Sequence, residues 1–208
     1  MARGRFISLE GGEGVGKSTQ LRALATLLGE RGIEVVTTRE PGGSPDAEAI
    51  RELLLTGDDA RWSPRAEALL FAAARADHVD KTIRPALAAG RWVISDRFLD
   101  SSLAYQGGGG GLGIDGVRQL HAFGSEGFLP DRTLVLTLGE GEGAQRAQAR
   151  DGGAADRIGG RDANFHDAVE QAFRYIAAAE PERVRLVDAS GSPADVTTRL
   201  AAELADLW

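Results

Sequence analysis

Residues Gly11-Gly12-Glu13-Gly14-Val15-Gly16-Lys17-Ser18 match the pattern G-x-x-x-x-G-K-[ST], a glycine-rich turn followed by a lysine and a hydroxyl residue. The apolar segment Phe6-Ile7-Ser8-Leu9 precedes this motif and predicts a short buried strand. Residues 18–31 follow it with leucines at helical spacing, and Gly32 is placed to end that helix. A strand, a glycine-rich turn and a helix in this order form the setting in which the motif binds phosphate.

Each part of this motif has a chemical role in holding a nucleoside triphosphate. The glycines let successive backbone N–H groups turn towards phosphate oxygens, and the N-terminus of the following helix adds a favourable dipole. Lys17 is predicted to reach the outer phosphates, and the Ser18 hydroxyl to ligate Mg²⁺. We expect ATP to be bound by nine residues: Gly11, Gly12, Glu13, Gly14, Val15, Gly16, Lys17, Ser18 and Thr19.

The rest of the chain alternates between strand-like and helix-like segments. Further strands are predicted at residues 33–38, 92–95, 134–136 and 184–187. Helical patterns occupy residues 48–55, 64–89, 164–179 and 193–207. In the longest of these, five apolar residues are expected to face inward: Leu69, Leu70, Ala73, Ala76 and Val79. This alternation predicts an α/β fold with a mostly parallel sheet, and ligands at the carboxyl ends of its strands.

Composition limits the functions that the chain can have. Its 208 residues fit one compact domain over 1–208, and 42% are hydrophobic, enough for a core. The net charge of -7 argues against a nucleic-acid partner, and no apolar run is long enough to span a membrane. The absence of cysteine excludes disulfides and thiolate metal sites. We therefore expect a cytoplasmic protein whose partners are small molecules.

Three further features extend the predicted phosphate site. Asp96 ends the strand-like segment 92–95, where a carboxylate can hold Mg²⁺ opposite Ser18 or, alternatively, cap the following turn. Two stretches are expected to be mobile: Gly107–Gly111, a run of five glycines with little to hold it in place without a ligand, and residues 150–161, which are polar and glycine-rich. Both segments can be ordinary surface loops, but arginines beside glycines favour a mobile lid over about residues 146–162.

The motif alone does not identify the class of nucleotide-binding protein. GTP-binding switches read guanine with an N-K-x-D motif, whereas the single asparagine here, Asn164, has no lysine beside it. Motor and transport ATPases generally need a longer chain. A small domain with several arginines fits a small-molecule kinase. A non-catalytic nucleotide-binding module is the alternative, and it would be expected to lack acceptor-site arginines.

Several other motifs resemble those of the thymidylate kinases, in order and at that family's spacing over residues 5–207. The segments that carry the resemblance are Thr38-Arg39-Glu40-Pro41-Gly42-Gly43, Leu70-Phe71-Ala72-Ala73-Ala74-Arg75, Asp96-Arg97-Phe98, Ser101-Ser102-Leu103-Ala104-Tyr105-Gln106-Gly107, Pro130-Asp131 and Asp156-Arg157-Ile158. The resemblance implies a P-loop nucleoside-monophosphate-kinase-like three-layer fold, with a five-stranded parallel sheet, helices on both faces and a mobile lid. It also implies ATP-dependent phosphorylation of dTMP to dTDP, which supplies dTTP for DNA synthesis.

The resemblance assigns roles to the acceptor site. Arg39 and Arg97 would hold the acceptor phosphate, since guanidinium groups bind phosphate oxygens in pairs. Tyr105 would pack against the sugar and leave little room for a 2′-hydroxyl, and Glu13 would accept a hydrogen bond from the 3′-hydroxyl. The base would be contacted by Phe71 through stacking and by Arg75, Ser102 and Gln106. Other roles remain open. Phe71 could belong to the helix core, and Arg39 and Arg97 could form surface ion pairs. Ser101 is as good a hydrogen-bond donor as Ser102.

The resemblance also implies the bacterial type of enzyme, with the catalytic arginine on the lid, because no arginine precedes Lys17 in the glycine-rich loop. The candidates are Arg146, Arg150, Arg157 and Arg161, among which spacing favours Arg150 and then Arg157. With Lys17 and Arg97 they complete the predicted catalytic set. The sequence departs from the family pattern at three positions: Gly110, Thr137 and Gln148.

Two matters remain open at this point. The acceptor could be another nucleotide, such as dUMP, or a nucleoside, because thymine and uracil differ by one methyl group, which a pocket distinguishes only weakly. The family suggests a homodimer, for which the apolar face of residues 64–89 is the expected interface.

Overall fold

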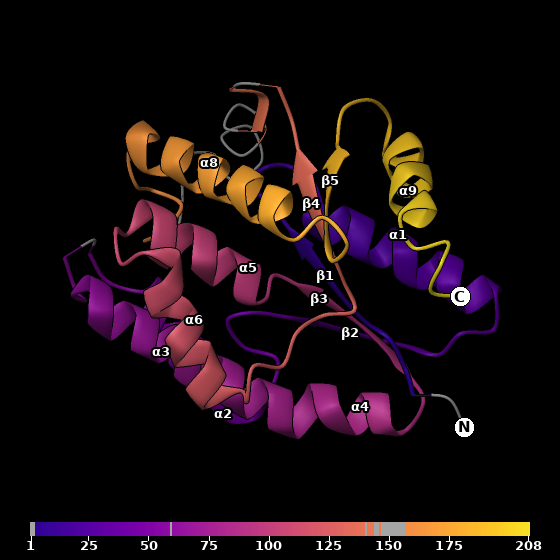
Figure 1. The fold of residues 1–208 in the computed structure, drawn as a ribbon, viewed down its shortest axis with the longest axis horizontal. Coiled ribbons are helices and arrows are strands. Elements are labelled where there is room, and N and C mark those ends of the chain that lie inside the picture. The colour runs from indigo at the N-terminus through magenta and orange to yellow at the C-terminus, as the bar shows by residue number, and fades with distance from the viewer. Residues whose placement is uncertain (1–2, 59, 140, 144–145, 147–156) are drawn as a thin grey trace.

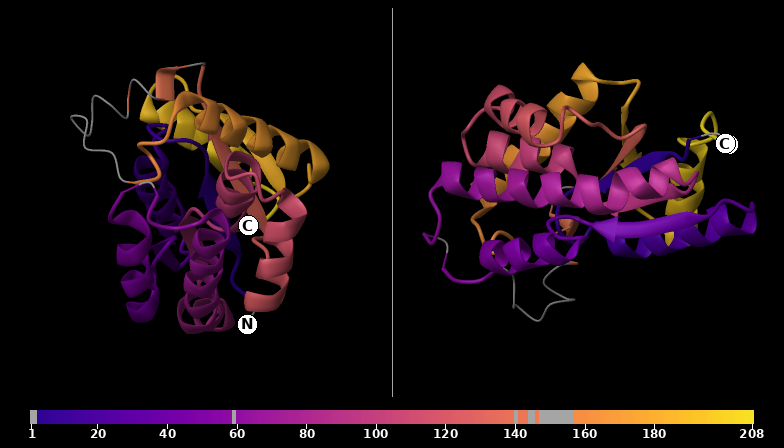
Figure 2. Two further views of the ribbon diagram at one scale, coloured as in Figure 1. Left: turned by 90° about the vertical axis from the view of Figure 1, so that its left-hand side faces the viewer. Right: turned by 90° about the horizontal axis from the view of Figure 1, so that it is seen from below.

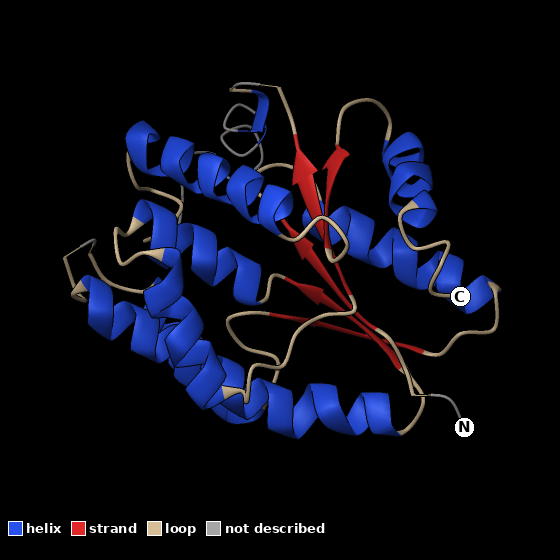
Figure 3. Ribbon diagram, in the orientation of Figure 1, coloured by secondary structure: helices blue, strands red, loops and turns tan. Residues whose placement is uncertain are grey.

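The computed structural model describes residues 3–58, 60–139, 141–143, 146 and 157–208. Five strands form one sheet in the order β2-β3-β1-β4-β5, and every neighbouring pair is parallel. The strands are β1 (Phe6–Glu10), β2 (Val35–Arg39), β3 (Trp92–Asp96), β4 (Arg132–Thr137) and β5 (Val184–Asp188). The expected α/β fold with a five-stranded parallel sheet is therefore confirmed (Figures 1 and 3).

Helices cover both faces of this sheet, which gives three layers (Figure 2). Alternate side chains of β1 point to opposite faces: Phe6 joins one hydrophobic cluster, whereas Ile7 and Leu9 join the other. Helices α1 (Lys17–Glu30) and α9 (Pro193–Ala202) cover the second cluster, and α8 (Ala163–Ala179) contributes to the first. Burial on both faces explains why the three central strands β1, β3 and β4 are largely apolar, whereas the edge strands β2 and β5 are only partly buried.

The predicted helix over residues 64–89 is present with one irregular turn. It consists of α3 (Pro64–His78), the π-helical turn η1 (Val79–Ile83) and α4 (Arg84–Ala88). The irregular turn precedes Pro85, which has no N–H to donate to the carbonyl four residues earlier.

The predicted inward face of this helix is wrong in part. Val79 is buried, but Leu69 is 55% exposed and Ala73 is also exposed. Polar side chains occupy the buried face of α3 instead: Glu67, Arg75 and His78. Arg75 and His78 both bond to Glu40, and Glu67 accepts hydrogen bonds from three other buried or partly buried side chains. Because the buried face of this helix is largely polar, apolar periodicity identified the wrong face as buried.

The glycine run is not a loose loop over its first three residues. Helix α5 (Leu99–Ser102) leads into the π-helix η2 (Leu103–Gly109), which packs against α8. A Cβ atom at Gly108 would lie 2.7 Å from Cβ of Ala172, and one at Gly109 would lie 2.6 Å from the ring of Phe165. The expected mobility of this segment is therefore corrected: these glycines allow two helices to approach closely.

Two further helices among the described residues are α2 (Pro45–Leu55) and α6 (Ile114–Gly124). Some helix starts carry capping side chains: Ser44 accepts from Ala47 N–H, and Ser192 forms a reciprocal capping box with Asp195. The predicted helix over residues 193–207 has regular α-helical structure only to Ala202. No helix in the described part of the chain has both the length and the apolar character needed to cross a bilayer.

Candidate active site

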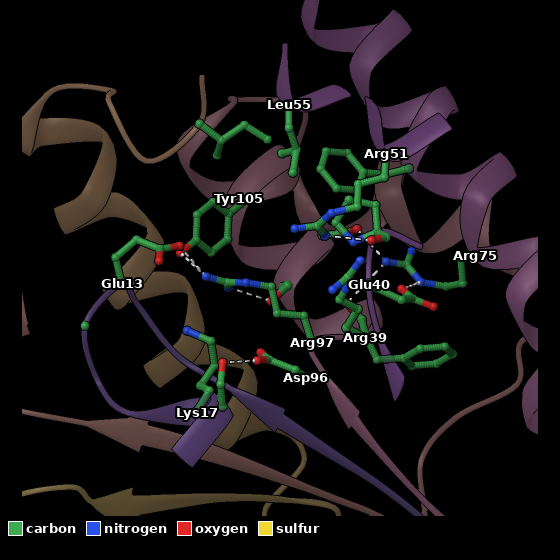
Figure 4. A pocket seen from close by; sticks show the side chains of 18 of the residues that line it. Glu13, Lys17, Arg39, Glu40, Arg51, Leu55, Arg75, Asp96, Arg97 and Tyr105 are labelled. Atoms are coloured by element: carbon green, nitrogen blue, oxygen red, sulfur yellow. Dashed lines mark hydrogen bonds and ion pairs between the residues drawn. The ribbon is translucent and has the colours of Figure 1, made fainter. Parts of the chain in front are cut away.

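A pocket of about 510 Å³ opens beside the residues that follow β1, β2 and β3 at their carboxyl ends (Figure 4). Its floor and walls come from the glycine-rich loop, from α2 and α3, and from α5 and η2. Parallel strands bring segments far apart in the sequence to this one edge, which is where such folds bind ligands.

The glycine-rich loop has the backbone that the motif predicts. Gly11 has φ +126°, and a Cβ atom there would lie 2.4 Å from the carbonyl oxygen of Leu136, so only glycine fits. Gly16 is left-handed, with φ +94°, and α1 begins directly after it. The loop thus leads into a helix N-terminus, where backbone N–H groups bind anions.

Lys17 is folded back over this loop. Its Nζ atom donates to the carbonyl oxygens of Gly11, at 3.1 Å, and Gly12, at 2.6 Å. Burial, with the nearby charge of Arg97, lowers the pKa of Lys17 from 10.5 to about 8. A buried ammonium group held by two carbonyl oxygens is suited to exchange them for phosphate oxygens.

Ser18 and Asp96, the two residues predicted to ligate Mg²⁺, lie in direct contact. The Ser18 hydroxyl donates to Oδ2 of Asp96 at 2.8 Å. Among the residues that the structure describes, no group of three or more His, Cys, Asp or Glu side chains could hold a metal ion. A hydroxyl and a single carboxylate still fit Mg²⁺, because this ion usually takes its other ligands from phosphates and water.

Arg97 joins the loop to the opposite wall of the pocket. Its Nη1 donates to the Gly11 carbonyl at 3.1 Å, and its Nη2 donates to Oε1 of Glu13 at 2.5 Å and to the Tyr105 hydroxyl at 3.3 Å. Its guanidinium carbon also lies 4.9 Å from the centre of the Tyr105 ring. The predicted phosphate-binding arginine thus lies between the glycine-rich loop and η2.

The backbone of Arg97 is held in an unusual conformation, with φ +71°, and Glu10 fixes the residues that follow it. Oε1 of Glu10 accepts from Phe98 N–H at 2.8 Å, and Oε2 accepts from the Ser101 hydroxyl. Burial, with the nearby charge of Asp100, raises the pKa of Glu10 to about 7. Our sequence reasoning assigned no role to Glu10, although an acid at the end of a buried strand is a signal of one.

The residues expected to contact the base also line the pocket. Phe71 is half-buried, and Arg75 is held by three bonds: Nε donates to Oε2 of Glu40 at 2.8 Å, and Nη2 donates to the Ser102 hydroxyl at 2.7 Å and to the Phe98 carbonyl at 3.2 Å. Because Ser102 bonds to Arg75 and Ser101 bonds to Glu10, the two serines have different partners. The aromatic ring and the arginine therefore face the same cavity.

Two further arginines lie at the pocket wall. Arg39 lines it and donates to Oε2 of Glu48 at 3.1 Å. Arg51, which our sequence reasoning missed, also lines it and donates to the Pro41 carbonyl at 2.7 Å. Glu40 was likewise missed, and it accepts from both Arg75 and His78. Only the fold reveals these roles, because α2 and α3 must first be placed beside the end of β2.

The predicted lid arginines have different fates. Arg146 is exposed and lines the pocket, whereas Arg150 lies outside the described residues. Arg157 is buried away from the pocket lining: its Nε donates to the Leu54 carbonyl at 2.8 Å and its Nη2 to Glu67 at 2.5 Å. The structure therefore does not bring Arg157 together with Lys17 and Arg97.

Of the other residues predicted to contact a nucleotide, some line the pocket and some do not. Six residues of the loop and of the start of α1 line the pocket: Glu13, Gly14, Gly16, Lys17, Ser18 and Thr19. Gly11, Gly12 and Val15 shape the loop but do not line the cavity. Tyr105 and Gln106 line its far wall, both nearly fully buried.

Comparisons with known proteins point to one family. The family model described as thymidylate kinase matches residues 9–200. The chain is 64% identical over 205 residues to the thymidylate kinase of Rhizorhabdus wittichii, covering 98% of each, and 50% identical over 195 residues to that of a Synechococcus species, covering 94% of this chain and 91% of the relative. The crystal structure of thymidylate kinase from Ehrlichia chaffeensis matches with a TM-score of 0.79 and 30% identity, covering 97% of this chain and 99% of that one. The chain belongs to the thymidylate kinase family.

Proposed function

We propose that the chain transfers the γ-phosphoryl group of Mg²⁺-bound ATP to the phosphate of dTMP inside the pocket described above. As a member of its family, it is a dTMP kinase that converts ATP and dTMP to ADP and dTDP. The observation that carries the residue assignment is the position of Arg97, whose guanidinium contacts both the Gly11 carbonyl of the donor loop and the Tyr105 hydroxyl on η2. A guanidinium that contacts both walls of the pocket supports this assignment, because it can neutralise an acceptor phosphate bound between them.

On the donor side, the glycine-rich loop binds the phosphates of ATP through its backbone N–H groups. Lys17 exchanges its carbonyl partners for phosphate oxygens and neutralises their charge. Ser18 and Asp96 would hold Mg²⁺, which, when bound, neutralises charge on the transferring group.

On the acceptor side, Arg39 and Arg97 hold the phosphate of dTMP. Glu13, which pairs with Arg97 in this structure, accepts from the 3′-hydroxyl of the sugar. Tyr105 packs against the sugar edge, where an added 2′-hydroxyl would clash. The acceptor oxygen is already anionic, so little base catalysis is needed, and positioning with charge neutralisation supplies the acceleration.

The base lies against Phe71, which stacks on the thymine ring. Arg75 donates to its exocyclic oxygen, with Ser102 and Gln106 completing the surroundings of the base. The bonds of Arg75 to Glu40 and Ser102 support this assignment, because they fix its guanidinium at the pocket wall before any substrate arrives.

A lid arginine supplies the remaining cation, since the donor loop contains none before Lys17. We assign this role to Arg150. The burial of Arg157 against Glu67 favours a role in anchoring its segment to α3 instead.

The chain is also proposed to act as a homodimer in the cytoplasm, with small molecules as its only substrates. Leu69 on α3 is 55% exposed and Phe123 on α6 is 94% exposed, and these two helices pack side by side. An exposed apolar surface of this kind is suited to pack against the same surface of a second copy of the chain. Light scattering coupled to size exclusion tests this: the mass of a dimer is expected, and a Phe123→Asp variant should yield monomers.

Acceptor profiling tests the proposed substrate against another nucleotide or a nucleoside. ADP release is measured with dTMP, dUMP and thymidine at matched concentrations. ADP release with dTMP is expected to be faster than with dUMP by about tenfold or more, which is the discrimination that one methyl group in a pocket allows. No ADP release is expected with thymidine. Preferred phosphorylation of thymidine would contradict the proposal, because the site would then not be built around an acceptor phosphate.

A further inference from the structure

Glu67 is a buried acid that the proposed chemistry leaves without a role. It lies on the same face of α3 as Phe71 and Arg75, because residues four apart on a helix are stacked one turn above another. Its side chain is 3% exposed. An acid in this position is rarely retained without a specific set of partners.

Three donors surround its carboxylate. Oε1 accepts from Nε2 of Gln106 at 3.0 Å. Oε2 accepts from Nη2 of Arg157 at 2.5 Å and from Nη2 of Arg161 at 2.6 Å. The two guanidinium groups thus hold one oxygen and leave the other directed at the amide of Gln106.

This arrangement determines which way the amide of Gln106 faces. A glutamine amide has a donor side, NH₂, and an acceptor side, the carbonyl oxygen, whereas a carboxylate has only acceptors. The NH₂ group must therefore face Glu67. The carbonyl oxygen then lies on the other side of an amide that is 2% exposed and lines the pocket.

We propose that Glu67 is a positioning residue for base selection: it orients Gln106 so that the pocket presents an acceptor to the N3–H group of thymine and opposes cytosine. This inference rests on the proposed function, in which Gln106 contacts the base. Thymine and uracil carry a donor at N3, whereas cytosine carries an acceptor there. Two acceptors facing each other in a buried site leave both without a hydrogen bond, which is costly.

The substitution Glu67→Gln tests the inference in the full-length chain. A glutamine at this position can turn its own NH₂ group towards Gln106, whose amide is then free to reverse. The ratio of kcat/KM for dTMP to that for dCMP is expected to fall by about tenfold, and the ratio of dTMP to dUMP should stay within threefold of the parent's. If the role of Glu67 were purely structural, kcat/KM would fall by the same factor for dTMP, dCMP and dUMP, and both ratios would stay unchanged.

The matched control is Arg161→Ala, which removes a partner of Oε2 but leaves the contact between Oε1 and Gln106. Its dTMP to dCMP ratio should stay within threefold of the parent's. Because Glu67→Gln leaves two guanidiniums without a carboxylate, it can prevent folding. The double variant Glu67→Gln/Arg157→Met then takes its place, compared with Arg157→Met alone.

The possible results separate the inference from the function on which it rests. A parent enzyme that consumes ATP with dTMP, and whose dTMP to dCMP ratio falls only when Glu67 is changed, supports the inference. An active parent whose ratio stays within threefold in Glu67→Gln, or falls equally in the control, overturns the inference alone. A parent that does not use dTMP overturns both.

Discussion

The buried ammonium group of Lys17 predicts a variant that gains stability and loses activity. In Lys17→Met an apolar side chain of similar length replaces the lysine. Burial lowers the pKa of Lys17 from 10.5 to about 8, which corresponds to a cost of about 3 kcal/mol for keeping the charge in the folded protein at pH 7. The two lost hydrogen bonds to Gly11 and Gly12 offset about 1 kcal/mol each. The net gain is about 1 kcal/mol, or a rise in Tm of about 2–4 °C.

The activity of the same variant should fall steeply. Lys17 is placed to neutralise charge on the transferring group, and removing one such electrostatic partner typically costs about 10²–10³ in kcat. Retained folding with lost turnover separates a functional role of Lys17 from a structural one.

The gain in stability should depend on pH with a definite sign. Between pH 8 and 10.5 the folded parent releases the Lys17 proton while the unfolded chain keeps it, so the parent's free energy of unfolding rises with pH relative to the variant's. The parent therefore gains about 2 kcal/mol between pH 7.5 and 9.5, which exceeds the variant's net advantage, so the variant should melt above the parent at pH 7.5 and below it at pH 9.5. Thermal unfolding by circular dichroism and a coupled ADP assay measure both quantities. A variant that melts below the parent at pH 7.5, or that keeps more than a tenth of the activity, would refute the reasoning.

Three further predictions concern the sugar site, the lid and the glycine run. The parent should prefer dTMP to ribothymidine monophosphate, and Tyr105→Ala should reduce that preference, measured as a ratio of kcat/KM. Equal kcat/KM for both acceptors in the parent would contradict the proposed role of Tyr105. Arg150→Ala should lower kcat by about 10³-fold, at the low end for arginine fingers, with little change in KM. Arg157→Ala should mainly lower Tm, because Arg157 is paired with Glu67. A large loss of kcat in Arg157→Ala with little loss in Arg150→Ala would show that Arg157 is the catalytic arginine. Gly109→Ala should lower the free energy of unfolding by about 1–3 kcal/mol in urea, since its Cβ atom would meet the ring of Phe165; an unchanged midpoint would show that η2 and α8 separate easily.

The sheet and the phosphate-binding loop could be predicted because their signals are local. A run of apolar residues marks each buried strand, and the loop motif lies within eight consecutive residues. The carboxyl ends of parallel strands meet at one edge, so the pairing of Ser18 with Asp96 follows from the order of the elements, and the two side chains lie 2.8 Å apart.

The polar face of α3 could not be predicted, because its signals are distant in the sequence. Glu67 is buried only because Gln106, Arg157 and Arg161 bond to it, and these partners lie 39 to 94 residues further along the chain. Periodicity treats a buried acid as a surface residue, and so it assigned Leu69 to the core although that side chain is 55% exposed.

The glycine run misled for a related reason. Five consecutive glycines suggest a loop when only neighbouring residues are considered. Here the lack of side chains at Gly108 and Gly109 makes room for Ala172 and Phe165 of α8, a helix more than 50 residues away. Close approach of two backbones is a property of the packed fold and has no local signature.

The most direct measurement of the central claim follows the phosphoryl group itself. The full-length chain is incubated with dTMP, Mg²⁺ and ATP labelled at the γ-phosphate, and the products are separated. The assignment of Lys17, Arg97 and the acceptor pocket predicts that the label appears in dTDP, in a one-to-one ratio with ADP, and only when dTMP is present. Label found in inorganic phosphate at the same rate with and without dTMP would contradict it, because the pocket would then hydrolyse ATP without delivering its phosphoryl group to an acceptor.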